Sequence, residues 1–249
     1  MSQSVQNPLK LFTCSPMRII PNGAGGTRVE SLTVEWHRAI AGMHMPFGWN
    51  GAEIRLDGYE VGEARCLAVQ SARQQGGDFL LFIDNDVLVP PFAFRQLLYR
   101  ATATHPDVDI FAGVYCDKSQ PPFPIIFKEW NSGPYWDWTI GDVIEDVKAV
   151  PMGCTLLRLS LFDRLKQTEE KPWFKTVRHE DMPTSLGTMT EDIYFCKRAV
   201  EEAGCKILVD TKVICGHISN SSGELFVLPE DCPPVKRAGI KLSEPEAAI

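Results

Sequence analysis

The sequence predicts an α/β protein built around a parallel sheet. Two observations carry this prediction. In the first 115 residues, apolar runs alternate with amphipathic helical patterns, which is typical of strand-helix-strand units with right-handed crossovers. Residues 79–83 (FLLFI) are apolar at all five positions, as expected of a central strand that is buried on both faces.

The elements of the first half follow from local pattern. Residues 9–14 form a short apolar run that ends at Ser15-Pro16, and we expect a strand there. Apolar residues spaced by three and four predict helices over 29–43 and 61–71. Pro90-Pro91 precedes a third helical pattern, and a further strand is expected over 108–115.

The second half has a different character. Pro and Trp clusters over 116–160 indicate short, mixed strands, and the polar segment 168–189 is predicted to be a long loop of the kind that forms active-site lids. A helix is expected over 191–203, with Gly204 as its stop. A late strand over 206–210 and a surface tail over 229–249 complete the chain.

Charge and cysteine usage exclude several functional classes. The 249 residues contain 25 Lys and Arg against 32 Asp and Glu, a net charge of −7, which disfavours a protein that coats nucleic acid. The eight cysteines include no C-x-x-C pair, which favours buried thiols over a zinc ribbon or a disulfide framework. No apolar run reaches the length of a membrane span and no secretory leader is recognisable, so we expect a cytoplasmic protein.

The most informative motif is Asp84-Asn85-Asp86, which directly follows the buried run 79–83. In open α/β sheets, ligands bind outside the carboxyl ends of the strands. Two carboxylates placed there repel each other, and a divalent cation that prefers oxygen ligands removes this repulsion. The alternative is a solvated turn, because Asp and Asn are common turn residues.

Four segments in order resemble GT-A fold glycosyltransferases, particularly the family 2-like enzymes. Residues 77–87 (GDFLLFIDNDV) resemble the strand and D-x-D motif, and 62–65 (GEAR) resemble the A-R-N segment, with Cys66 where Asn is usual. Residues 190–199 (TEDIYFCKRA) resemble the acidic motif on the acceptor side, and His217 resembles a late metal ligand. The resemblance covers about residues 8 to 220.

This resemblance implies one GT-A catalytic domain over 1–228, with a Rossmann-like nucleotide-sugar half at about 8–115 and a mixed-sheet acceptor half at about 116–228. It implies a nucleotide-diphosphate sugar donor, a UDP- or GDP-sugar, and a Mn2+ or Mg2+ ion. The residues implied in donor binding are Thr13, Arg18, Arg65, Asp84 and Asn85, and those implied in metal binding are Asp86, His217 and Asp84.

On the acceptor side, the resemblance implies that Asp192 is the general base and that Glu191 binds the acceptor or orients the loop. Trp130 and Gly153 fall where such enzymes contact their acceptors. Each residue also has a plainer interpretation. Carboxylates are favoured in the first turn of any helix, Arg65 would be a surface residue, and His217 a structural one.

Two other functions stay open at this stage. One is a nucleotidyltransferase or other phosphoryl-transfer enzyme, although residues 22–28 (NGAGGTR) lack the end of a P-loop. The other is a non-catalytic module that binds a nucleotide sugar. The sequence also does not identify the acceptor, whose hydroxyl could belong to a glycan, a lipid, a protein or a hydroxymethylated DNA base. The negative net charge mildly disfavours DNA. The sequence does not distinguish inversion from retention of configuration at the anomeric carbon of the sugar.

Overall fold

The computed structural model of the protein describes residues 9–17, 19–21, 27–29, 32–47, 50–130, 132–178, 188–228 and 236–237. Arg18, the centre of the predicted lid and almost all of the predicted tail lie outside these residues. No helix in the described part of the chain is long and apolar enough to cross a membrane.

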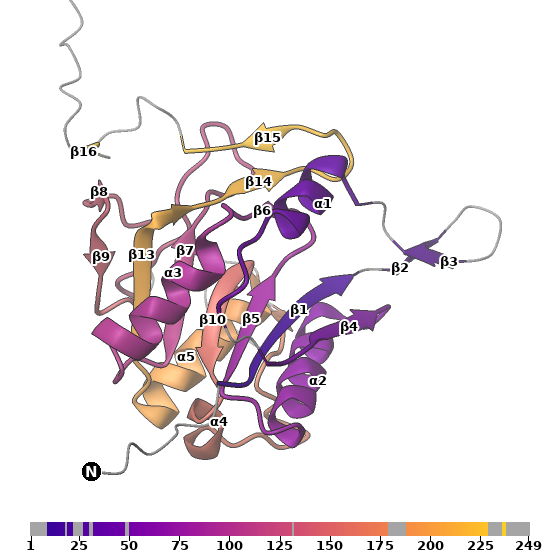
Figure 1. Cartoon of the computed structure of the whole chain (residues 1–249), viewed down its shortest axis with the longest axis vertical. Coiled ribbons are helices and arrows are strands. Elements are labelled where there is room, and N and C mark those ends of the chain that lie inside the picture. The colour runs from indigo at the N-terminus through magenta and orange to yellow at the C-terminus, as the bar shows by residue number, and fades with distance from the viewer. Residues whose placement is uncertain are drawn as a thin grey trace, which may run out of the picture.

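A seven-stranded mixed sheet forms the centre of the molecule (Figure 1), in the order β4-β1-β5-β10-β7-β13-β9. The predicted α/β class is therefore confirmed. β1 is parallel to both β4 and β5, and β7 is parallel to β13. The strands are β1 (Leu11–Met17), β4 (Glu53–Asp57), β5 (Phe79–Ile83), β7 (Ile110–Val114), β9 (Val143–Ile144), β10 (Cys154–Arg158) and β13 (Ile207–Ile214).

The strands that the first 115 residues contribute to this sheet run in the same direction, as predicted, but a strand from the second half of the chain lies among them. β10 lies between β5 and β7 and is antiparallel to both. Four of its five residues are buried, so it can occupy a central position with apolar groups on both faces. Strands from both expected halves of the chain therefore share one sheet.

Helices cover the two faces of the sheet. Leu80 and Phe82 of β5 point into a cluster with α2 (Val61–Gln74), α4 (Leu161–Arg164) and α5 (Glu191–Ala203). Phe79, Leu81 and Ile83 point to the other face, toward α3 (Ala93–Tyr99). The alternation follows from the two-residue repeat of a strand. It gives β5 apolar neighbours on both sides and makes it a rigid base for the residues that follow it.

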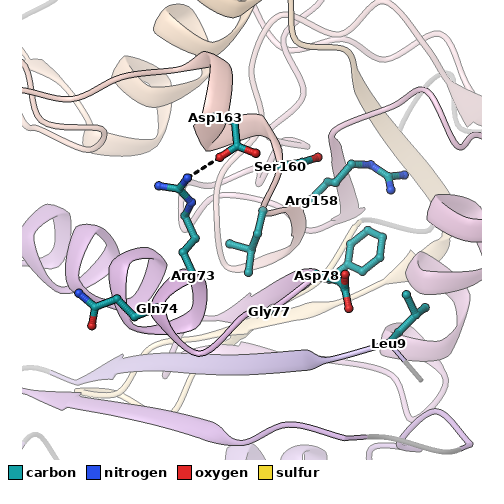
Figure 2. Close-up of a pocket in the computed structure, with 10 residues that line it drawn as sticks. Leu9, Arg73, Gln74, Gly77, Asp78, Arg158, Ser160 and Asp163 are labelled. Carbon is teal, nitrogen blue, oxygen red and sulfur yellow. Dashed lines mark hydrogen bonds and ion pairs between the residues drawn. The ribbon is translucent and has the colours of Figure 1, made fainter. Parts of the chain in front are cut away.

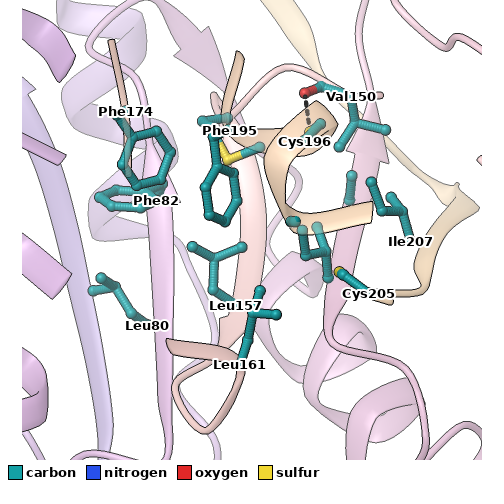
Figure 3. Close-up of a cluster of buried hydrophobic side chains, with 14 of the residues drawn as sticks. Leu80, Phe82, Val150, Leu157, Leu161, Phe174, Phe195, Cys196, Cys205 and Ile207 are labelled. Atoms are coloured by element: carbon teal, nitrogen blue, oxygen red, sulfur yellow. Dashed lines mark hydrogen bonds between the residues drawn. The ribbon is translucent and has the colours of Figure 1, made fainter. Parts of the chain in front are cut away.

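Aromatic packing fixes α5 on this sheet (Figure 3). The rings of Phe174 and Phe195 stack with centroids 4.2 Å apart, and Phe82 meets Phe174 edge-on at 5.9 Å. The Cys196 thiol donates to the Val150 carbonyl at 3.5 Å. Phe174 and its neighbour Trp173 are thus core residues that anchor the start of the segment 173–178.

Several element boundaries differ from those predicted. α1 (Val34–Ala41) begins later than residue 29, because the Thr33 side chain accepts from the Trp36 N–H and caps the helix there. β1 continues through Pro16 to Met17. β5 pairs with β1 only as far as Cys14, so proline occupies a position with one unpaired side, where it is tolerated.

The remaining elements are short. Part of the predicted loop 168–189 is a two-stranded ribbon of β11 and β12. The short elements are β2 (Ile19–Pro21), β3 (Thr27–Val29), β6 (Val87–Leu88), the π-helix η1 (Arg100–Thr104), β8 (Thr139–Ile140), β11 (Val177–Arg178), β12 (Thr188–Met189), β14 (Gly216–Ile218), β15 (Leu225–Phe226) and β16 (Lys236–Arg237).

Candidate functional site

The segment Asp84-Asn85-Asp86 connects β5 to β6 at the carboxyl ends of β1 and β5, beside α1 and β14 (Figure 1). Its backbone is held from three directions. The Asp84 N–H donates to the Gly153 carbonyl at 3.1 Å, the Trp36 indole N–H donates to the Asp84 carbonyl at 2.9 Å, and the Ile218 N–H donates to the Asp86 carbonyl at 2.8 Å. The two carboxylates therefore project from a turn whose backbone is anchored to the surrounding protein.

Asp86 and His217 lie together, as expected. β14 pairs with β6 so that His217 is opposite Val87, next to Asp86. The imidazole Nε2 is 3.4 Å from Asp86 Oδ2, and its Nδ1 is 2.8 Å from the Cys116 carbonyl oxygen. A carbonyl only accepts hydrogen bonds, so Nδ1 carries a proton and donates it to this oxygen, and Nε2 faces Asp86.

This arrangement creates a demand for positive charge. A carboxylate oxygen and an imidazole lone pair that face each other repel unless a cation or a second imidazole proton lies between them. Lys118 supplies part of that charge, since its Nζ is 2.7 Å from Asp86 Oδ2. Burial raises the pKa of Asp86, but hydrogen bonds from His217 and Lys118 outweigh it and lower that pKa to about 2.

The donor set fits a divalent ion in part. Within the described ranges, no group of three or more His, Cys, Asp or Glu side chains is arranged to hold a metal ion. Asp86 provides a hard oxygen ligand and His217 a nitrogen ligand of intermediate softness. Mg2+ sites often use one or two protein ligands together with substrate phosphates. Asp84 is directed elsewhere, because both of its carboxylate oxygens accept from Arg65.

Arg65 is a buried hub and not a surface residue. It lies in the first turns of α2 and is 2% exposed. Its Nη2 donates to the two Asp84 oxygens at 2.9 and 3.1 Å, and its Nε lies 3.3 Å from Glu191 Oε1. It is therefore held between Asp84 and Glu191 and does not line the cavity beside the D-x-D segment, and its contact with a donor stays a prediction.

Glu191 and Asp192 open α5 beside this hub. Burial raises the pKa of Glu191 to about 7, outweighing the nearby Arg65 charge, which lowers it. Asp192 is half-buried, and its Oδ1 accepts from the Ile193 N–H at 2.8 Å and from the Thr190 hydroxyl. Burial raises the pKa of Asp84, Arg65 lowers it, and the charges of Asp86 and Asp192 raise it further, so the carboxylates of the two motifs share one electrostatic environment.

The raised pKa of Glu191 makes stability depend on pH. Between about 4.5 and 7 the folded chain holds a proton on Glu191 that the unfolded chain releases, so the free energy of unfolding falls as pH rises through this range. Glu191→Gln should remove this fall and be more stable than the unsubstituted protein at pH 8, by on the order of 3 kcal/mol. Urea titrations at pH 5 and 8 measure it. The exposed Glu201→Gln on the same helix is the control, and parallel pH profiles for the two variants would contradict it.

A cavity of about 420 Å³ adjoins the D-x-D segment. It is lined by Pro16, Met17, Tyr59, Val61, Asp84, Asn85, Asp86, Lys118, Ser219, Asn220 and Ser221. Thr13 is not among these residues. It lies in the middle of β1, opposite Leu81 of β5, because the strand ends at Met17 and not at Cys14. Pro16 and Met17 take the place that was expected for Thr13.

Sequence reasoning missed several lining residues. Lys118 belongs to no motif, and its contact with Asp86 spans 32 positions. A detectable signal was present in residues 219–222 (SNSS), a polar run directly after the strand that carries His217. Hydroxyl and amide groups there suit phosphate or sugar oxygens.

The two predicted acceptor residues lie away from this cavity. Gly153 is buried behind Asp84, with its N–H donating to the Tyr115 hydroxyl at 3.1 Å. Burial raises the pKa of Tyr115 well above its ordinary value. Trp130 is half-buried and packs against the core cluster under α5. Gly153 supports the backbone of Asp84 from behind, and acceptor contact by either residue stays a prediction.

Gly153 should not tolerate a side chain. A Cβ there would lie 2.5 Å from the Tyr115 hydroxyl oxygen and 2.8 Å from Val87 Cγ2. Gly153→Ala should therefore lower the free energy of unfolding by about 1 to 3 kcal/mol through overpacking. Gly133→Ala, where no atom lies within 4 Å, is the matched control. Equal denaturation midpoints for the two variants would contradict this prediction and show that the side chains around Gly153 move to accommodate the methyl group.

A second hollow, of about 550 Å³, lies at the amino end of β5, whereas the D-x-D segment follows its carboxyl end (Figure 2). Arg73 is paired there with Asp163 at 2.5 Å. Arg158 donates to the backbone carbonyls of Val108 and Ala101 at 3.1 and 2.8 Å. These charged groups already have partners within the protein, so we assign no ligand to this hollow.

Comparison with known proteins adds information on the fold. No protein-family model matches the chain, and no curated protein matches it either. A crystal structure of A197 from STIV aligns over 95% of this chain and 100% of its own, with a TM-score of 0.55 and 16% identity. This likeness shows a shared fold and nothing further.

Two weaker alignments accompany it. Residues 1–349 of TarS from S. aureus align over 81% of this chain and 58% of their own length, with 15% identity and a TM-score of 0.46. A glycosyltransferase involved in the glycosylation of the major capsid of PBCV-1 aligns over 62% of both chains, with 12% identity and a TM-score of 0.31.

Proposed function

We propose that this chain is a metal-dependent glycosyltransferase of the GT-A type that transfers a sugar from a UDP- or GDP-sugar to an acceptor hydroxyl. One observation carries the proposal. Asp86 Oδ2 and His217 Nε2 face each other at 3.4 Å beside a cavity of about 420 Å³, at the carboxyl end of a buried parallel strand. A carboxylate, an imidazole and a nearby ammonium are suited to a divalent ion and a diphosphate.

Asp86 and His217 would hold Mn2+ or Mg2+. The ion supplies Lewis-acid stabilisation of the negative charge that develops on the leaving diphosphate. Lys118 adds a second positive charge from the wall of the cavity. The hydroxyl and amide groups of 219–221 would bind phosphate or sugar oxygens, and Pro16, Met17 and Tyr59 would line the nucleoside end.

Asp192 would act as general base on the acceptor. In that step the acceptor hydroxyl oxygen bonds to the anomeric carbon, the bond from that carbon to the diphosphate oxygen breaks, and the hydroxyl proton passes to Asp192. Glu191 would be partly protonated near neutral pH, since burial raises its pKa to about 7, and in its protonated form it would donate a hydrogen bond to the acceptor. The acceptor is a hydroxyl of a glycan, a lipid, a protein or a hydroxymethylated DNA base.

Nucleotide binding tests the donor half of this proposal. UDP and GDP are titrated separately into the protein, once in Mn2+ and once in EDTA, and binding is measured by calorimetry. We expect one of them to bind in the presence of Mn2+, and His217→Ala to abolish the metal-dependent part of the affinity. His105→Ala, which removes a histidine that is paired with Glu145 outside the cavity, is the control. Equal nucleotide affinity in His217→Ala and the unsubstituted protein would remove His217 from the site.

A further inference from the structure

Lys118 and His217 converge on the same atom of Asp86. Lys118 Nζ is 2.7 Å and His217 Nε2 is 3.4 Å from Oδ2. The loop that carries Lys118 is anchored on both sides of it. Cys116 contributes the carbonyl that orients His217, and Asp117 Oδ1 accepts from the Ser119 hydroxyl at 2.8 Å and the Phe123 N–H at 2.9 Å. The backbone is thus fixed while the lysine side chain spans to Asp86.

An ammonium group and a divalent cation that both bind this oxygen would repel each other. A metal ion held by Asp86 and His217 would lie within a few ångströms of the Lys118 charge, where like charges repel strongly. Binding of the ion alone must therefore displace the ammonium from a 2.7 Å ion pair. Lysine has a flexible four-carbon stem and three rotatable donors, so it can leave Asp86 without moving the backbone.

The cavity contains hydrogen-bond acceptors for the displaced ammonium group. Lys118 itself lines it, together with Ser219, Asn220 and Ser221. The Oδ1 atom of Asn220 is buried and has no hydrogen-bond partner among the described residues. A diphosphate in this cavity would add further acceptors, and phosphate oxygens bind lysine well.

We propose that Lys118 guards the metal position: it neutralises Asp86 in the free protein and moves to the diphosphate when the nucleotide and the metal bind together. This inference rests on the proposed function and adds a regulation of the same site. Metal and nucleotide then bind with positive coupling, because each removes an obstacle to the other. The ammonium thus weakens the binding of a divalent ion until the donor arrives.

The test compares Lys118→Met with the unsubstituted protein in calorimetric titrations of Mn2+ alone, of UDP and GDP alone, and of each nucleotide in saturating Mn2+. Methionine keeps the length of the side chain and removes its charge. We expect Mn2+ alone to bind Lys118→Met about tenfold more tightly, and the gain in nucleotide affinity that Mn2+ brings to fall by about tenfold, within the usual range of coupling between sites. Lys128→Met, which removes a lysine that lies over the Tyr135 ring, is the control and should behave like the unsubstituted protein.

The outcomes separate this inference from the proposed function. Asp86→Ala should lose Mn2+ binding. If Mn2+ and a nucleotide bind but Lys118→Met has unchanged or weaker Mn2+ affinity, the guarding role is wrong and the proposed function stands. If Mn2+ binds Asp86→Ala as well as the unsubstituted protein, or binds neither protein, the metal site itself is wrong and the inference falls with it. A circular dichroism spectrum confirms that each variant is folded.

Discussion

Arg65→Met should lower the free energy of unfolding by about 3 to 5 kcal/mol, the usual cost of removing one partner from a buried charge cluster. Arg65 is 2% exposed and is held between Asp84 and Glu191. Without it, the buried carboxyl group of Glu191 and the half-buried one of Asp84 lose the guanidinium that lies within 3.3 Å of them. Urea denaturation at pH 7 followed by circular dichroism measures the change.

A variant on the same helix provides the control for this result. Arg73 pairs with Asp163, whose side chain is 67% exposed, and such pairs contribute about 0 to 1 kcal/mol. Arg73→Met should therefore have little effect. The triple variant Arg65→Met, Asp84→Asn, Glu191→Gln should recover part of the lost stability, because it removes the unpaired charges. If Arg65→Met were as stable as Arg73→Met, the buried hub would be wrong.

Asp192→Asn should reduce sugar transfer by about 100- to 10,000-fold, the range in which a general base contributes to rate. Asparagine has the size of aspartate and can still accept from the Ile193 N–H, so α5 should keep its start. Donor affinity should change less than twofold, because Asp192 does not line the donor cavity. The measurement is kcat with saturating donor, alongside the calorimetric affinity for the nucleotide.

Asp163→Asn, in the wall of the second hollow and outside the D-x-D cavity, controls for a general loss of carboxylate charge. Transfer by Asp192→Asn within threefold of the unsubstituted rate would exclude it as the base. A loss of nucleotide binding in place of turnover would assign it to the donor side. Retention of configuration at the anomeric carbon, read by NMR of the product, would also contradict a simple general-base role.

The parts of the fold that could be predicted are those with strong local patterns. β5 and α5 begin and end where apolar runs and the Gly204 stop indicate. By contrast, the place of β10 between β5 and β7 depends on pairing between distant segments, which no local pattern specifies. The start of α1 was misplaced because apolar spacing continued through residues that the Thr33 cap excludes from the helix.

The same distinction applies to the site. The D-x-D segment could be predicted from its position directly after a buried strand, and His217 was identified only through the resemblance to GT-A enzymes. The burial of Arg65 was not predictable, because an arginine near a helix start is ordinarily exposed and its partners lie 19 and 126 positions away. Lys118 was missed for the same reason, since a single lysine in a loop gives no sign of a distant carboxylate.

The most direct test of the proposed function is the identity of the product released from a donor. A panel of UDP- and GDP-sugars is incubated with the protein in Mn2+ or EDTA, and free nucleotide is resolved by chromatography. We expect UDP or GDP to appear with one donor, only in Mn2+, and not with Asp86→Ala. Release of pyrophosphate when the same protein is given a nucleoside triphosphate and a sugar phosphate would instead show a nucleotidyltransferase. Binding of a nucleotide sugar with no turnover in any acceptor mixture would contradict catalysis and leave a binding module.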